Sequence, residues 1–299
     1  MKPTLFLLLT CYLVCIAAHA QTDCRKQAAF VQKFGFDPSR TALSTSEKKF
    51  LGLVLIQFKD INNLSAGNTK TYQHPSWRMA GALGPIATDA FGNAYTTPIA
   101  SINVLNNPTQ KQNTVYKIDA NTGEMALLVA LPAPKYNDKM MFQNPFGAVG
   151  LGYDCDAHTL YVSSLAGSTR TQELGKIFLV NLKNNEITTL LDSIDAMGVA
   201  VCKTTGEKRL YFGKTRSSDV FSVALTDGRA SGAPKFEFSL EAQGARGDDK
   251  ARRIKALPNG DLQVVGIEFY YNLTAPTDKP ETNYIYRYSP SKKFWLRVQ

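Results

Sequence analysis

The sequence has few of the side chains and motifs that most often mark an enzyme. Only three histidines occur among 299 residues, His19, His74 and His158. No GxSxG nucleophile elbow, HExxH zinc motif or P-loop is present. A Ser-His-Asp triad is defined by geometry, so it stays open, but no segment proposes one. The chain therefore lacks the signatures of the common hydrolases, metalloproteases and nucleotide-binding enzymes.

Long uncharged apolar runs are absent beyond the N-terminus. The chain opens with Lys2, a mostly apolar run from Leu5 to Ala18, and the small-x-small tripeptide Ala18-His19-Ala20. The run is shorter than the about 20 residues that a membrane-spanning helix needs. Neither Cys15 nor Cys24 is placed for lipid attachment at the cleavage point, which disfavours a lipid anchor. The sequence predicts a cleaved signal peptide over residues 1–20 and no transmembrane segment, so residues 21–299 are expected to be secreted or periplasmic.

Cysteines are few once the predicted signal peptide is removed. Cys11 and Cys15 leave with it, and Cys24, Cys155 and Cys202 remain. An odd number cannot pair completely within one chain. Export permits a disulfide, but Cys155 and Cys202 lie at nearly equivalent places in successive repeats, which tend to be too far apart for a bridge. The pairing stays open at this point.

Acidic residues are outnumbered by basic ones, 25 against 34, for a net charge of +9. The basic residues are scattered, which is typical of a solvated surface. Nucleic acid is not expected as a partner, because an exported chain without interleaved aromatic and basic residues offers no stacking platform.

Self-similarity at about 50 residues is the most informative pattern, because such periods mark repeat arrays and propellers. Each copy has a short strand, a turn rich in Asp, Asn and Gly, an apolar strand, and two amphipathic strands joined by a tight turn. Four copies run over residues 84–132, 147–192, about 197–241 and 252–299.

A degenerate copy precedes residue 84, with LGLVLIQFKD and TKTYQHP as its last two strands. Its first strands come either from residues 30–48 or from the C-terminus, which would then close the ring. The fold predicted is all-β: a single β-propeller domain over residues 21–299, with five or six four-stranded blades.

The segments GLGYDCDAHTLYVSS and TVYKIDANTGE resemble the six-bladed propellers of the gluconolactonase-like and NHL-like superfamily. LVLIQF, TYQHP and AYTT show a fainter likeness to the yellow/major royal jelly family. The lactonase branch of that resemblance implies a divalent metal in the central channel, held by Asn, Asp and Glu oxygens. Aligning the repeats puts its ligand positions on four residues without a carboxylate or amide side chain: Gly84, Val149, Met197 and Arg252. We therefore expect no cofactor, unless a rearranged site recruits Asp195 or Glu268 for a cation such as calcium.

Two segments carry the other candidate site residues. GARGDDKARRI places Arg246, Asp248, Asp249, Arg252 and Arg253 on the loop entering an inner strand, near the channel mouth. An arginine fork there would hold a small anionic ligand, whereas salt bridges that brace the blades are the favoured interpretation.

His74 and Trp77 form the second candidate group, which would line a pocket mouth if it is not structural.

Because the metal ligands are missing, the primary hypothesis is a secreted, non-catalytic propeller that binds a small anionic ligand or an extracellular protein. The alternative is a lactonase-like hydrolase or isomerase with a rearranged channel site.

Overall fold

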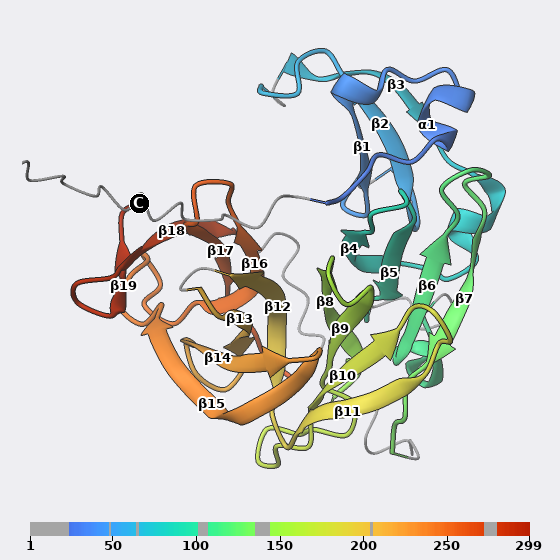
Figure 1. The fold of residues 1–299 in the computed structure, drawn as a ribbon. Helices are drawn as coiled ribbons and strands as arrows, with labels where there is room; N and C mark the ends of the chain where they lie inside the picture. Colours follow the sequence, from blue (N-terminus) through green and yellow to red (C-terminus); the bar gives the residue numbers. More distant parts are fainter. Residues whose placement is uncertain are drawn as a thin grey trace, which may run out of the picture.

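The computed structural model describes residues 24–47, 49–63, 66–100, 107–134, 144–203, 206–271 and 280–299. Within these residues, nineteen strands form five antiparallel sheets that follow one another along the chain. Figure 1 shows the sheets arranged in sequence around a common centre, with one strand of each directed toward it. The arrangement is a five-bladed β-propeller, so the predicted all-β class is confirmed.

The blades are numbered here in chain order. Blade 1 contains β1 (Thr41–Ser44), β2 (Val54–Phe58) and β3 (Asn68–Tyr72). Each other blade has four strands in sequence order, the first innermost. Their bounds are β4 (Leu83–Thr88), β5 (Ala94–Pro98), β6 (Thr114–Ile118) and β7 (Met125–Ala130) in blade 2; β8 (Ala148–Asp154), β9 (Thr159–Ser164), β10 (Lys176–Asn181) and β11 (Ile187–Asp192) in blade 3; β12 (Ala196–Lys203), β13 (Lys208–Lys214), β14 (Asp219–Thr226) and β15 (Arg229–Ser239) in blade 4; and β16 (Lys250–Ala256), β17 (Leu262–Ile267), β18 (Thr282–Ser289) and β19 (Phe294–Arg297) in blade 5.

The four complete blades coincide with the four predicted repeats. The hairpin turns also take the backbone conformation that their residues predict, since Gly123, Asn185, Asp227, Gly228 and Gly260 all have positive φ. The degenerate first copy is a three-stranded blade among the described residues, with its first strand inside residues 30–48. The C-terminal strand β19 pairs with β18 of its own blade, so this strand does not complete blade 1.

The inner strands of blades 2 to 5 share one irregularity near their first residues. The ladder with the second strand shifts register between Leu83 and Ile86, Ala148 and Gly150, Ala196 and Val199, and Ala251 and Arg253. A β-bulge of this kind bends the strand and increases its twist. In two blades a glycine at the bulge lets the next inner strand approach closely. A Cβ on Gly150 would lie 1.9 Å from the Met197 carbonyl oxygen, and one on Gly198 would lie 2.9 Å from the Arg252 carbonyl oxygen.

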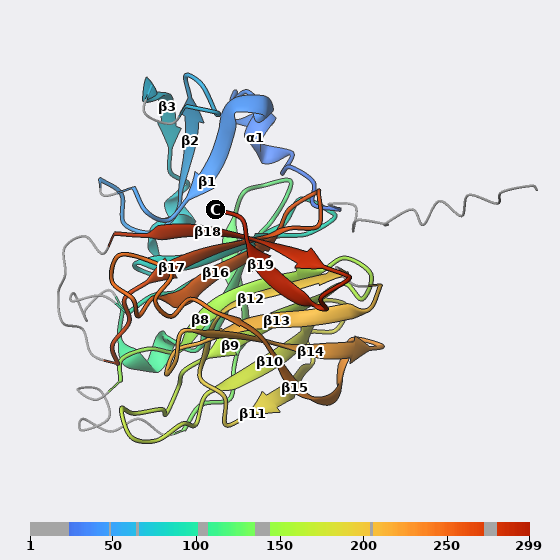
Figure 2. The same cartoon turned by 90° about the vertical axis from the view of Figure 1, so that its left-hand side faces the viewer.

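Four hydrophobic clusters join the blades in pairs. Residues of blade 1 pack with blade 2, blade 2 with blade 3, blade 3 with blade 4, and blade 4 with blade 5. Among the described residues, no core cluster joins blade 5 back to blade 1. Figure 1 agrees, because β1–β3 stand apart from β16–β19 in that view, and Figure 2 shows β1–β3 at one end of the array, above β18. The array is therefore held by packing between successive blades.

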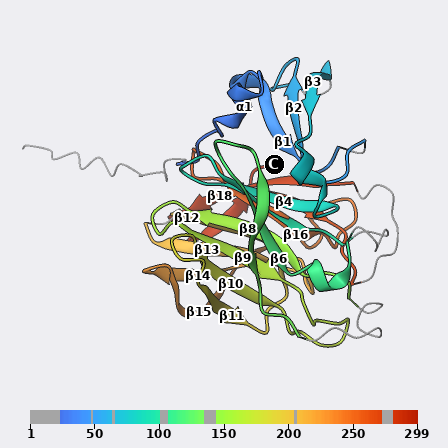
Figure 3. The same cartoon turned by 90° about the vertical axis from the view of Figure 1, so that its right-hand side faces the viewer.

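Short helices and one disulfide fix the N-terminal segment. Helix α1 (Phe30–Lys33) lies beside β1 and β2 (Figure 3), and Phe30 and Val31 join the blade 1–blade 2 core. The 3-10 helices are η1 (Pro38–Arg40), η3 (Pro75–Arg78) and η4 (Thr109–Lys111).

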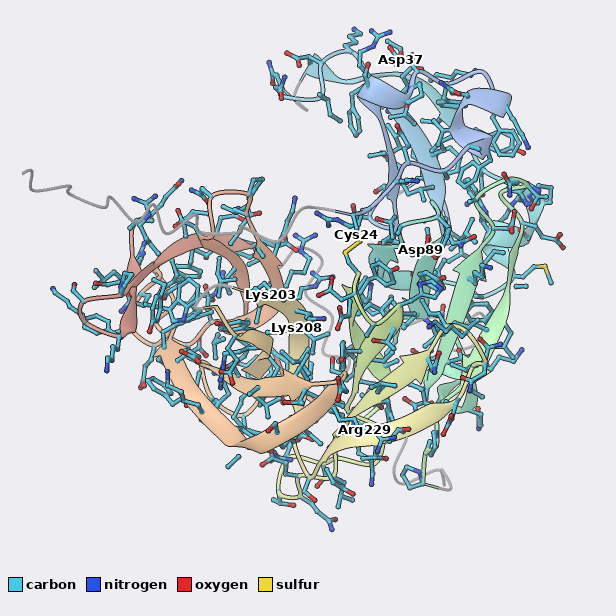
Figure 4. The ribbon with its side chains drawn as sticks, in the orientation of Figure 1. Cys24, Asp37, Asp89, Lys203, Lys208 and Arg229 are labelled. Carbon is cyan, nitrogen blue, oxygen red and sulfur yellow. A yellow bond between two sulfur atoms is a disulfide. The ribbon has the colours of Figure 1, made fainter. Side chains whose placement is uncertain are left out.

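Cys24 forms a disulfide with Cys155 in the β8–β9 turn of blade 3, across 131 residues of sequence (Figure 4). Cys202 is a buried thiol in the blade 4–blade 5 core. The expectation that Cys155 and Cys202 are too far apart to pair is consistent with this pairing, whereas the partner of Cys155 was not predicted.

The predicted signal peptide, residues 1–20, lies outside the described residues. Within the described part of the chain, no helix is long and apolar enough to cross a membrane.

The close approach of the inner strands predicts a position-specific sensitivity to a single methyl group. Replacing Gly150 by alanine places Cβ against the Met197 carbonyl, so the backbone of β8 or β12 must move. The free energy of unfolding should therefore fall by about 3 kcal/mol. Gly152→Ala on the same strand is the matched control, because its Cβ would lie 3.2 Å from the nearest atom. Urea unfolding of the two variants measures the difference. Equal stability of Gly150→Ala and Gly152→Ala would show that β8 and β12 are not this close.

The disulfide predicts a second stability effect. Replacing Cys24 and Cys155 together by serine opens a loop of 131 residues and should lower the free energy of unfolding by about 2–5 kcal/mol. Guanidinium unfolding of residues 21–299, with and without the substitutions, measures the loss. Alkylation of the denatured, unreduced protein should label only Cys202, and labelling of all three cysteines would contradict the pairing.

Candidate functional site

The connections that carry the candidate residues gather at one end of the array. They are the links from second to third strands of blades 2 to 5 and the links that enter β8, β12 and β16, which antiparallel geometry places at the same end of each blade. We call this the loop end. Its described segments are 107–113, 131–134, 144–147, 165–175, 193–195, 215–218, 240–249, 268–271 and 280–281.

Asp195, immediately before β12, is the most heavily bonded carboxylate of the loop end. Its side chain is completely buried. Oδ1 accepts hydrogen bonds from the Ser168 hydroxyl and from the Gly175 backbone N–H at 2.9 Å. Oδ2 accepts from Arg216 Nε at 2.8 Å and from the Tyr271 hydroxyl. Because these donors belong to blades 3, 4 and 5, the carboxylate ties three blades together.

Arg216 is bound as fully as its carboxylate partner. Besides Asp195, its guanidinium donates to the carbonyl oxygens of Thr169, Arg170 and Gln172 at 2.6, 3.0 and 2.5 Å. It also lies 5.1 Å from the centre of the Tyr271 ring, in a cation–π contact. Burial, followed by the hydrogen bond to Asp195, raises the pKa of Tyr271, so this hydroxyl stays a donor. Arg216 thus holds the β9–β10 loop of blade 3 against blade 4.

Asp249 occupies the equivalent position in blade 5, immediately before β16. Oδ1 accepts from Arg246 Nε and Nη2 at 2.9 and 2.5 Å, and Oδ2 accepts from the Tyr284 hydroxyl at 2.6 Å. Burial opposes ionisation of Asp249, but the hydrogen bonds from Tyr284 and Arg246 outweigh it, and the pKa of Asp249 is lowered. Burial and the bond to Asp249 raise the pKa of Tyr284 to about 12. The predicted arginine fork at Arg246 therefore binds a carboxylate of its own loop.

The other charged candidates divide between the blade 5 sheet and its loops. Arg252 and Arg253 both contact Glu281, at 3.1 and 2.5 Å. Asp248 is exposed, and its carbonyl oxygen accepts from Lys250. Glu268 is half-buried and accepts a hydrogen bond from the Tyr270 hydroxyl at 2.8 Å.

His74 and Trp77 lie away from the loop end. Trp77 is fully buried in the blade 1–blade 2 core, and its indole N–H donates to the Gly123 carbonyl at 2.7 Å. Gly123 belongs to the β6–β7 turn, at the opposite end of β6 from the β5–β6 connection. The His74 Nδ1 caps η3 by accepting from the Ser76 backbone N–H at 3.3 Å. These contacts give both residues structural roles.

An aromatic contact spans the loop end between blades that are not neighbours in the ring. The rings of Phe146, before β8 of blade 3, and Phe269, after β17 of blade 5, have centroids 5.2 Å apart. Phe269 also packs edge-on against Tyr271 at 5.2 Å. Phe146 and Phe269 are partly exposed. The loop end therefore presents an apolar surface beside the buried Asp195 cluster.

The residues at the expected metal positions do not fit a divalent cation. Gly84, Val149, Met197 and Arg252 all fall inside the bulges of their inner strands, so the repeat alignment places them in equivalent positions. None supplies a side-chain oxygen, which hard cations need. Asp195 already accepts four hydrogen bonds. Within the described residues, no three His, Cys, Asp or Glu side chains form a group that could hold a metal ion.

Sequence reasoning missed the partners that give Asp195 its environment. Ser168, Arg216 and Tyr271 lie in loops of three different repeats, and none belongs to a motif. A usable signal was present in Asp195 itself, because Asp195 and Asp249 both stand directly before an inner strand. The recurrence of aspartate at that position indicates a repeated structural role.

Comparisons with known proteins find distant structural likenesses. No protein-family model matches the chain, and no curated protein matches it significantly. The solved structures that it resembles include a nidogen/laminin complex (TM-score 0.48, 9% identity, covering 87% of this chain and 90% of that one). They also include the calcium-binding protein regucalcin from Agrobacterium tumefaciens (0.47, 12%, 82% and 66%) and a glucose dehydrogenase (0.45, 14%, 82% and 77%).

The alignment thus spans just under two thirds of the regucalcin chain. At such low identities the likeness concerns the fold alone.

The lowered pKa of Asp249 predicts an acid-dependent loss of stability. The unfolded chain binds a proton near the ordinary pKa of 3.8, whereas the folded carboxyl stays ionised to lower pH. The Asp249 contribution is therefore complete above about pH 4 and is lost as the pH falls through the folded pKa. Asp249→Asn should be less stable by about 2 kcal/mol at neutral pH, with the difference shrinking below pH 4. Urea unfolding across pH measures it, with exposed Asp60→Asn as control. A stability difference between the wild type and Asp249→Asn that does not shrink below pH 4 would contradict the lowered pKa of Asp249.

Proposed function

We propose that the mature chain is an exported, non-catalytic propeller that binds a small anionic ligand or an extracellular protein at its loop end. The observation that carries this proposal is the state of Asp195, whose two carboxylate oxygens are both occupied by donors of the protein. A carboxylate in that state is positioned to hold loops together. The partly exposed Phe146 and Phe269 beside it are suited to contact a partner.

Export is part of the proposal and has two supports. The first twenty residues follow the pattern of a cleaved secretory signal. The Cys24–Cys155 disulfide suits an oxidising compartment such as the periplasm or the extracellular space.

The alternative is a secreted lactonase-like hydrolase or isomerase that uses Asp195 or Glu268. Glu268 is the better placed of the two, because it is half-buried beside Phe269 at the loop end. Asp195 would have to lose its bonds to Arg216 and Tyr271 before it could bind a cation or take a proton.

A paired substitution separates these two functions. Residues 21–299 should take up no stoichiometric calcium by titration calorimetry and hydrolyse no member of a lactone panel. Asp195→Asn should lower the free energy of unfolding by about 3–5 kcal/mol, because it breaks the ion pair of buried Asp195 with partly buried Arg216, whereas Glu268→Gln should leave stability nearly unchanged. Tight calcium uptake together with lactone turnover that either substitution abolishes would overturn the proposal.

A further inference from the structure

The last blade has one sheet face that belongs to no core cluster of the described residues. Side chains of a strand alternate between the two faces of its sheet. Ile254, Val264, Tyr286 and Trp295 point toward blade 4 and belong to the shared core cluster. The residues between them in the ladders point the other way, toward the side where the ring would close. This outer face of blade 5 carries Arg253, Lys255, Gln263, Val265, Ile267, Asn283, Ile285, Arg287 and Leu296, and among them Val265 and Ile267 are buried.

Positive charge dominates this outer face. The side chains of Arg253 and Arg287 are 57% and 60% exposed, Lys255 is exposed, and Arg252 in the adjoining bulge is 39% exposed. Two carboxylates offset them: Glu281 contacts both Arg252 and Arg253, and buried Asp261 holds Arg287. Four basic groups against two acids leave an excess of positive charge, which favours an acidic partner.

Apolar side chains lie among these charges. Leu296 and Phe294 stand on the outer face of β19 with 37% and 43% exposure, and partly buried Ile285 lies on the neighbouring strand β18. Apolar contacts surrounded by arginine are typical of protein–protein interfaces. A purely polyanionic sugar chain would leave the apolar side chains without contacts. The combination therefore favours a polypeptide over a polysaccharide.

We infer that the outer face of blade 5 is a docking surface for an acidic polypeptide segment that alternates acidic and apolar side chains. Such a segment, in extended form, presents both kinds of side chain at the two-residue period of the sheet. The inference goes beyond the proposed function, because it names a second binding surface, on a sheet face of blade 5 and not on the loops of the loop end.

The test uses residues 21–299 and defined probes. Fluorescence anisotropy measures binding of a labelled peptide of alternating glutamate and valine, its charge-reversed counterpart of alternating lysine and valine, and an oligogalacturonate. The glutamate peptide should bind, and Arg253→Glu with Lys255→Glu should weaken it by about tenfold or more. Lys183→Glu with Arg229→Glu is the matched control, because it changes the net charge equally at exposed turns of blades 3 and 4. That control should change affinity by about twofold at most. Thermal melts verify folding of both variants.

Each other outcome overturns the inference. Equal weakening in the two double variants would show attraction by overall charge, and equal binding of the two peptides would remove the charge preference. Failure of the wild type to bind the glutamate peptide contradicts the partner class. Binding of oligogalacturonate alone, lost in Arg253→Glu with Lys255→Glu, would assign the face to a polysaccharide. None of these binding results measures turnover. The proposed function is tested separately, by calcium uptake and lactone hydrolysis, so its failure can be told apart from failure of this inference.

Discussion

Packing of each sheet against the next is the interaction on which this structure depends. A single antiparallel sheet has two faces, and a stable blade must bury at least one of them. Here four core clusters connect five blades in chain order. The close contact of β8 with β12 needs Gly150, since a side chain there would meet the Met197 carbonyl. Small residues and bulges in the inner strands thus set the spacing that positions every loop.

The loop end is organised by two buried aspartates. Asp195 and Asp249 each precede an inner strand, and each is held by an arginine and a tyrosine hydroxyl. Removing one partner from such a cluster leaves a buried charge or donor unsatisfied, which explains why the loops are fixed in place. The same saturation makes these carboxylates poor metal ligands. The two carboxylates therefore hold the loops of the loop end in place.

The blades could be predicted from the sequence because their signals are local. Asn121-Thr122-Gly123 and Asp227-Gly228 specify tight turns, and alternating strands such as 220–225 specify a face to bury. The site could be predicted only in part. Asp249 and Arg246 could be named as candidate residues from the sequence because both lie in one charged loop. Ser168, Arg216 and Tyr271 could not, because they come together only through the packing of three blades. His74 and Trp77 were chosen for their chemistry, and the core between blades 1 and 2 gives them a structural role that local sequence does not encode.

In the part of the chain that the structure describes, no core cluster closes the ring at the face of blade 5, and this feature links the fold to the binding proposals. Acylation of lysines, followed by mass spectrometry, tests it most directly. Lys255 on inner strand β16 points to the open side and should react as fast as Lys183 in an exposed turn, whereas Lys208, ion-paired with Asp154 and Asp156 and 14% exposed, should react slowly. Protection of Lys255 to the level of Lys208 in the isolated protein would show that another blade covers this face, and would contradict the account.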